Sequence, residues 1–150
     1  MVIYRLGSSR YPANDGLGAS LYGGRWNSRG VRVVYASTSL ALAAVETFVN
    51  LEPNLRPADL VSIEGFIPDA LEIGRLDLKT LASHWHSTRD ESLHRFGDEW
   101  IRGGSGATLL VPSAAISGEW NILLNPAHPD FSTIEFRHPE PFAFDSRMFR

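Results

Sequence analysis

The sequence predicts an α+β fold whose sheet is mainly antiparallel and carries a few helices. Short runs rich in β-branched and aromatic residues, which are typical of strands, recur along the whole chain. Only two stretches place apolar residues at helical spacing, and they do not alternate with the strands as a doubly wound parallel sheet requires. With 150 residues, no internal repeat and no long linker, we expect one compact domain over residues 1–150.

The expected strands are short and are separated by turn residues, glycine and proline among them. In chain order they are Val2–Leu6, Val31–Ala36, Leu60–Ile67, Ala107–Val111, Asn121–Leu124, Thr133–Arg137 and Phe142–Phe144. Each combines apolar alternation with β-branched or aromatic residues, which pack well on a pleated surface. The absence of a regular βαβα alternation favours antiparallel pairing between them.

Two stretches predict helices of about three turns each, Ser39–Leu51 and Asp90–Arg102. The first can take its N-terminal cap from Ser37, Thr38 or Ser39. The second is followed by Gly103-Gly104, a common way for a helix to end. Gly97, in the middle of the second stretch, is unfavourable for a helix.

Composition limits the classes of function. A net charge of -3 and a pI near 5.9 provide no general attraction for nucleic acid, so we expect no direct nucleic-acid binding. The chain has no cysteine, which excludes disulfides and thiolate metal sites, and it has no apolar run long enough for a signal peptide or membrane span. We therefore expect a soluble, cytoplasmic protein with no membrane association.

No metal site is expected. His84 and His86 form a pair in a polar stretch, and His94 lies further along, but no cysteine or H-E-x-x-H pattern accompanies them. Loop histidines in contact with solvent are the simpler interpretation.

Arg25 follows Gly23-Gly24, and glycines allow a backbone to approach a ligand closely. Its planar guanidinium suits phosphate or carboxylate, although a tight turn with a surface arginine explains the same segment. Glu46 borders the apolar stripe of the first helix, where a carboxylate must reach solvent, pair with a cation or line a cleft. Arg5 and Arg25 are available cations.

Two further residues are candidates with equally simple alternatives. Tyr35 lies near the end of an expected strand, where core packing competes with ligand binding. Ser113 follows a strand and a proline, where its hydroxyl can serve only as a local cap. No G-x-S-x-G pattern surrounds Ser113, so a serine-hydrolase nucleophile is not supported.

Several segments, taken in order, resemble the RES domain family, which is named for an arginine, a glutamate and a serine. They are Tyr4-Arg5, Tyr22-Gly-Gly-Arg-Trp-Asn27, Val34-Tyr-Ala36, Leu40-Ala-Leu-Ala-Ala-Val-Glu46, Gly97-Asp-Glu-Trp100, Val111-Pro-Ser-Ala114, Asn121-Ile-Leu-Leu-Asn-Pro-Ala-His128 and Phe142-Ala-Phe-Asp145. The ordered set spans nearly the whole chain. The segment Leu76–Ser92 departs from the family pattern, since it lacks a proline-glycine-tryptophan character.

The resemblance implies a fold related to ADP-ribosyltransferases and the toxin of a type II toxin–antitoxin system. It implies degradation of NAD⁺, by hydrolysis or phosphorolysis of the nicotinamide–ribose bond, with NAD⁺ as substrate and no resident cofactor. It assigns catalytic roles to Arg25, Glu46 and Ser113. It assigns substrate binding to Arg5, Arg25, Tyr35 and Ser113.

The implied partner is an antitoxin with a helix-turn-helix DNA-binding region, and no pattern decides between a monomer and a homo-oligomer. Two alternatives stay open from the sequence, transfer of ADP-ribose to a protein and a non-catalytic nucleotide-binding module.

Overall fold

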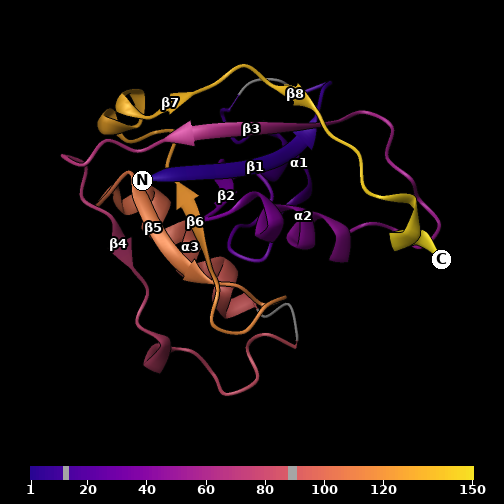
Figure 1. Ribbon diagram of the computed structural model, residues 1–150. Coiled ribbons are helices and arrows are strands. Elements are labelled where there is room, and N and C mark those ends of the chain that lie inside the picture. Colours follow the sequence, from indigo (N-terminus) through magenta and orange to yellow (C-terminus); the bar gives the residue numbers. More distant parts are fainter. Residues whose placement is uncertain (12–13, 88–90) are drawn as a thin grey trace.

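The computed structural model describes residues 1–11, 14–87 and 91–150. Its centre is a mainly antiparallel sheet with the strand order β4-β5-β6-β2-β1-β3-β7, and β8 also pairs with β3 (Figure 1). The strands are β1 (Val2–Ser8), β2 (Val34–Ser37), β3 (Leu60–Phe66), β4 (Gly74–Arg75), β5 (Thr108–Pro112), β6 (Trp120–Leu124), β7 (Glu135–Phe136) and β8 (Glu140–Pro141). Only the β4–β5 pair is parallel among the strand pairs of the described ranges. The expected α+β class with a mainly antiparallel sheet is confirmed.

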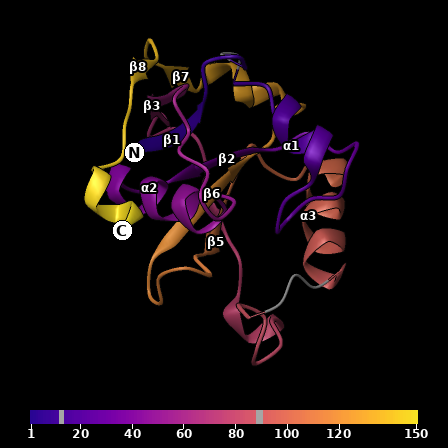
Figure 2. The ribbon, with the colours of Figure 1, turned by 90° about the vertical axis from the view of Figure 1, so that its right-hand side faces the viewer.

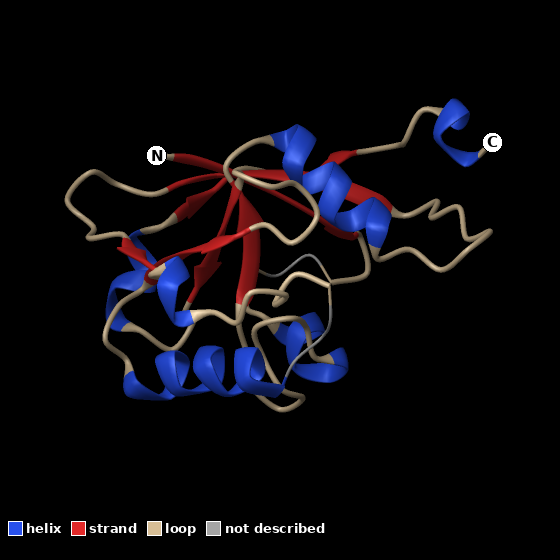
Figure 3. Cartoon of the chain, turned by 90° about the horizontal axis from the view of Figure 1, so that it is seen from below, coloured by secondary structure: helices blue, strands red, loops and turns tan. Residues whose placement is uncertain are grey.

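The helices lie outside the strands, as the view from below makes clear (Figure 3). The α-helices are α1 (Leu17–Tyr22), α2 (Leu40–Val49) and α3 (Glu91–Gly103). Single 3-10 turns are η1 (Leu78–Thr80), η2 (Pro129–Thr133) and η3 (Ser146–Phe149). The C-terminal segment lies beside α2 (Figure 2), where Phe144 and Phe149 pack edge-on against Phe48.

Alternating side chains of the central strands build two apolar clusters, one on each face of the sheet. Ile122 and Leu124 of β6 belong to one cluster, whereas Leu123 belongs to the other. The second cluster also includes Leu93 of α3, and Trp85, which follows η1 in the chain, packs against it. Tyr35 packs against this second cluster.

Both expected helices form. α2 begins after Ser39, whose hydroxyl accepts a hydrogen bond from Leu42 N at 3.1 Å, so Ser39 is the cap among the three candidates. α3 ends before Gly104, which adopts a φ of 62°. The expected first residue of this helix, Asp90, lies outside the described residues. No described helix has the length and apolar character needed to cross a membrane.

The main differences lie at the ends of the chain and in short elements. The expected strand Phe142–Phe144 is wrong, because the pairing with β3 occurs at Glu140–Pro141 and Phe144 turns away to pack on Phe48. The strand expected at Thr133–Arg137 is shorter, since Thr133 ends η2. The helix α1 was not expected, and its six residues carry no helical apolar pattern long enough to predict it.

Candidate active site

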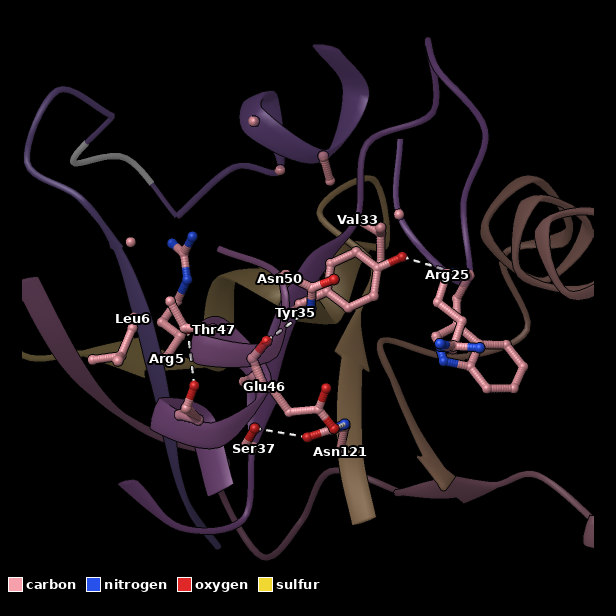
Figure 4. Close-up of a pocket in the computed structure, with 18 of the residues that line it drawn as sticks. Arg5, Leu6, Arg25, Val33, Tyr35, Ser37, Glu46, Thr47, Asn50 and Asn121 are labelled. Carbon is pink, nitrogen blue, oxygen red and sulfur yellow. Dashed lines mark hydrogen bonds between the residues drawn. The ribbon is translucent and has the colours of Figure 1, made fainter. Parts of the chain in front are cut away.

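A pocket of about 800 Å³ opens between β1, α1, β2 and α2. Arg5, Arg25, Tyr35 and Glu46, four of the five predicted site residues, all line it. Figure 4 shows Glu46 in the middle of this pocket, with Arg5 on one side and Arg25 on the other. Residues from four separate segments of the sequence therefore meet around one carboxylate.

The carboxylate of Glu46 accepts two hydrogen bonds on the same oxygen. Ser113 Oγ donates to Oε1 at 2.5 Å, and Asn121 Nδ2 donates to Oε1 at 2.6 Å. α2 brings Glu46 to the end of the β5–β6 hairpin, from which both donors come. Hydrogen bonds to an ionised acceptor are strong, so the side chain is held firmly at the pocket wall.

Ser113 lies behind Glu46 rather than in the pocket lining. It is 4% exposed, and its hydroxyl also accepts hydrogen bonds from Ala115 N at 3.1 Å and Ile116 N at 3.0 Å. In this arrangement the Ser113 hydroxyl holds the Glu46 carboxylate in place through its hydrogen bond to Oε1. A direct contact between Ser113 and a substrate stays a prediction.

Arg5 is a half-buried cation on β1. Its Nη1 donates to Asn14 Oδ1 at 2.6 Å, while its buried Nε has no hydrogen-bond partner among the described residues. Burial lowers the pKa of the Arg5 guanidinium from its ordinary value, and the nearby Asp15 opposes this shift. Arginine stays charged at neutral pH even so, and an anion in the pocket would offset the cost of burying it.

Arg25 lies in a tight loop that Tyr35 and Asn27 organise. Gly24 and Asn27 form an isolated β-bridge, and the Tyr35 hydroxyl accepts from Trp26 N at 3.0 Å and donates to Asn27 Oδ1 at 2.7 Å. A side chain at Gly24 would place Cβ 2.7 Å from the Tyr35 hydroxyl oxygen, so glycine is needed there for close approach. Each of the two interpretations of this segment holds in part. The chain makes a tight turn at Gly23-Gly24, and Arg25 lines the pocket.

The same loop is held from behind by α3. A Cβ on Gly97 would lie 1.7 Å from the carbonyl oxygen of Trp26, so the helix touches the loop backbone directly. The next residue, Asp98, is buried and accepts a hydrogen bond from Ser28 N at 2.9 Å. The glycine that is unfavourable for a helix is thus required for packing.

Three residues that support the site were not predicted as part of it: Asn27, Asp98 and Asn121. Asn27 is 0% exposed, and its Nδ2 donates to the carbonyls of Ala19, Ser28 and Val31. Each lies in a segment that carries the family resemblance. The available signal was a polar residue inside a segment that is otherwise apolar or turns tightly.

The arrangement combines one fixed carboxylate with two cations in a cavity large enough for a nucleotide-sized ligand. Such a set can stabilise positive charge next to the carboxylate and hold anionic groups at the arginines. Among residues 1–11, 14–87 and 91–150, no three histidine, aspartate or glutamate side chains gather as metal ligands. The predicted independence from metals stays a prediction.

Known proteins resemble this chain over nearly its whole length. A family model described as RES domain matches residues 2–145. A Sphingobium sp. (strain YBL2) protein named Prs ADP-ribosylating toxin is 38% identical over 146 residues, which are 93% of this chain and 90% of that protein. A Yersinia enterocolitica protein named Toxin Res is 37% identical over 154 residues and covers 99% of both chains.

The fold is also similar to a chain in the crystal structure of the M. tuberculosis MbcT-MbcA toxin-antitoxin complex. The TM-score is 0.66 and the identity 18%, over 95% of this chain and 84% of that chain. This second likeness concerns the fold.

Proposed function

The chain belongs to the RES domain family, and from this premise we propose that it is the toxin of a toxin–antitoxin system that cleaves the nicotinamide–ribose bond of NAD⁺. The observation that carries the proposal is the carboxylate of Glu46, fixed by two hydrogen bonds inside a pocket that Arg5 and Arg25 also line. NAD⁺ offers the matching features, a ribose carbon that becomes positive and a pyrophosphate.

The chemistry begins with the bond between the nicotinamide nitrogen and ribose C1′. When this bond breaks, its electron pair returns to the pyridinium nitrogen, and nicotinamide leaves as a neutral molecule. The leaving group therefore needs no proton and no metal ion. The positive charge left on the ribose is oxocarbenium-like, as in glycoside cleavage.

Glu46 stabilises this ribosyl cation more than it stabilises the ground state, because the charge at C1′ grows only as the bond breaks. Water or inorganic phosphate then forms the new C1′–O bond, and the proton that the attacking group gives up passes to the Glu46 carboxylate or to solvent. With water the product is ADP-ribose. With phosphate it is the 1″-phosphorylated form of ADP-ribose.

Arg5 and Arg25 are the groups we assign to the pyrophosphate, since a guanidinium forms paired, charge-assisted hydrogen bonds with phosphate oxygens. The partial burial of Arg5, and its Nε that finds no hydrogen-bond partner in the described part of the chain, support its share of this role. Tyr35 offers its ring to nicotinamide while its hydroxyl holds the Arg25 loop. Ser113 supports Glu46 by the hydrogen bond to Oε1.

Nicotinamide release from NAD⁺ by the purified protein tests the proposal. The protein is incubated with NAD⁺ in phosphate-free buffer and in buffer with added phosphate, and the products are separated by chromatography. Free nicotinamide together with ADP-ribose indicates hydrolysis, and the phosphorylated product indicates phosphorolysis. Intact NAD⁺ in both buffers would contradict the proposal and favour either transfer to a protein acceptor, which is absent from this assay, or a non-catalytic nucleotide-binding module.

A second candidate is transfer of ADP-ribose to a protein, which the 38% identical relative named Prs ADP-ribosylating toxin favours. The same carboxylate and arginines would serve this reaction, with a protein side chain in place of water. NAD⁺ labelled in the adenine ring separates the two reactions when cell extract is added. Label on a protein band supports transfer, and label only in small products supports degradation.

A toxin needs an inhibitor, so we propose a cognate antitoxin with a helix-turn-helix DNA-binding region. We also propose that the toxin acts on the NAD⁺ of the cytoplasm. The similar fold in a toxin-antitoxin complex supports an antitoxin partner. Expression of this chain alone should stop growth and lower cellular NAD⁺. Co-expression of the antitoxin should restore both, and normal growth during verified expression of the chain alone would contradict the toxin assignment.

A further inference from the structure

We propose that Asn121 is a positioning residue that, together with Ser113, fixes Glu46 through Oε1 and leaves Oε2 as the oxygen that faces the substrate. The inference rests on the proposed function, because it concerns how Glu46 meets the ribosyl cation. Asn121 is the second residue of β6 and also lines the pocket. Neither its amide nor its position was predicted to take part in the chemistry.

The Glu46 carboxylate fixes the direction of the Asn121 amide, because a carboxylate only accepts hydrogen bonds whereas the Ser37 hydroxyl can donate or accept. Ser37 Oγ donates to Asn121 Oδ1 at 2.7 Å, so the amide oxygen points to Ser37 and the amide nitrogen to Glu46. A flipped amide would place its oxygen against the Glu46 carboxylate, with no proton between two acceptors. Ser37 and Asn121 stand directly opposite each other on β2 and β6, and Figure 4 shows the hydrogen bond between them.

The direction of the Ser113 hydroxyl is fixed in the same way. Its oxygen accepts from Ala115 N and Ile116 N, so the single hydroxyl proton is directed to Glu46 Oε1. Ser113 directly follows β5 and Asn121 lies on β6, its partner in one hairpin, in which Val111 pairs with Asn121 and Ser113 N donates to Glu119 O at 2.9 Å. The hairpin therefore presents both donors to one oxygen.

The second oxygen of Glu46 has no such partner. Among the described residues no hydrogen bond reaches Glu46 Oε2, although both protein donors meet at Oε1. Two directed bonds at one oxygen prevent the carboxylate from turning about its last torsion, which is otherwise broad. Oε2 is then available to approach the ribose from a fixed direction. This lowers the entropic cost of ordering the Glu46 carboxylate in the transition state.

Asn121→Asp keeps the shape and the hydrogen bond from Ser37 but replaces the amide donor with a second carboxyl group beside Glu46. Two carboxyl groups this close share a proton, which weakens the charge of Glu46. We expect this variant to bind NAD⁺ with little change in KM while kcat falls by about ten-fold or more, since a misplaced reacting group costs rate rather than binding. Asn121→Ala removes the donor without adding a second carboxylate. It is expected to lower kcat in the same direction and keeps the test possible if the aspartate variant does not fold.

Asn125→Asp is the matched control, since Asn125 is also buried but its Nδ2 donates to Ile101 O at 3.1 Å, away from Glu46. This variant should lose thermal stability and keep the kcat of the folded protein. A merely structural role for Asn121 would make the two aspartate variants behave alike. The measurements are the melting temperature, kcat and KM for nicotinamide release, on the same preparations.

A fall in kcat confined to the Asn121 variants supports the inference. If wild-type protein turns over NAD⁺ and both Asn121 variants keep its kcat, the positioning role is overturned while the proposed function stands. If the wild-type protein leaves NAD⁺ intact, the proposed function fails, and the inference fails with it.

Discussion

Gly97→Ala is the substitution for which the structure gives the clearest expectation, because it adds one methyl group at the contact between α3 and the Arg25 loop. The added Cβ would lie 1.7 Å from the carbonyl oxygen of Trp26 and 2.8 Å from its carbonyl carbon. Real Cβ atoms do not approach other heavy atoms within 3.0 Å. The loop or the helix must therefore move by about 1 Å or more to relieve the overlap.

The size of the effect follows from that displacement. Adding a methyl group to a well-packed contact costs about 1–3 kcal/mol. A change of 1 kcal/mol shifts the melting temperature of a protein of this length by roughly 3 °C. Since the loop carries Arg25, a displacement of about 1 Å should also lower turnover by about a hundred-fold.

The assay pairs thermal unfolding by circular dichroism with nicotinamide release. Gly103→Ala is the control, because Gly103 is in the same helix and a Cβ there would meet nothing within 4 Å. Alanine favours a helix over glycine by up to about 1 kcal/mol, so the control should keep or slightly raise the melting temperature and keep full turnover. A Gly97→Ala protein with unchanged melting temperature and turnover would refute the close contact between α3 and the loop.

The remaining predictions concern the loop, the arginines and metals. Asn27→Ala should cost about 2 kcal/mol or more, measured by chemical denaturation, because it removes the hydrogen bonds that Asn27 Nδ2 donates to backbone carbonyls and the one that its Oδ1 accepts from Tyr35; stability within about 0.5 kcal/mol of wild type would contradict this. Arg25→Lys keeps the charge but loses the planar fork, so KM for NAD⁺ should rise, and unchanged kinetics would place Arg25 outside the binding of substrate. Activity should survive chelation, because the pyridinium leaves as a neutral molecule; loss on chelation that a divalent ion restores would overturn that chemistry.

Periodicity predicted the parts of the fold that depend on local pattern. α2 is an example, because its apolar residues recur at helical spacing and Ser39 supplies the cap. The central strands were predicted for the same reason, since each alternates between two buried faces. Phe142 and Phe144 show where local pattern stops predicting structure. Their aromatic side chains suit a strand and suit equally well the cluster that they form with Phe48 and Phe149.

The candidate site divides in a similar way. Arg5, Arg25, Tyr35 and Glu46 were predicted and do line one pocket, while their roles in chemistry stay predictions. Supporting residues were missed because their purpose lies in contacts with distant segments. Gly97 is only unfavourable by helix propensity, and its reason is the backbone of Trp26, which lies about 70 residues earlier in the chain.

Asn121 shows why hydrogen-bond partners could not be predicted from spacing. Its meaning depends on the pairing of β2 with β6, which brings Ser37 opposite, and on the packing of α2 against β1 and β2, which brings Glu46 within reach. Both are long-range arrangements that no local pattern fixes.

Nicotinamide release by Glu46→Gln is the most direct measurement of the proposed chemistry. Glutamine keeps the shape and one oxygen for Ser113 and Asn121 but removes the negative charge that stabilises the ribosyl cation. The variant should fold, bind NAD⁺ with little loss, and release nicotinamide about a hundred-fold or more slowly. A well-folded Glu46→Gln protein with near-normal release would contradict the central role of this carboxylate.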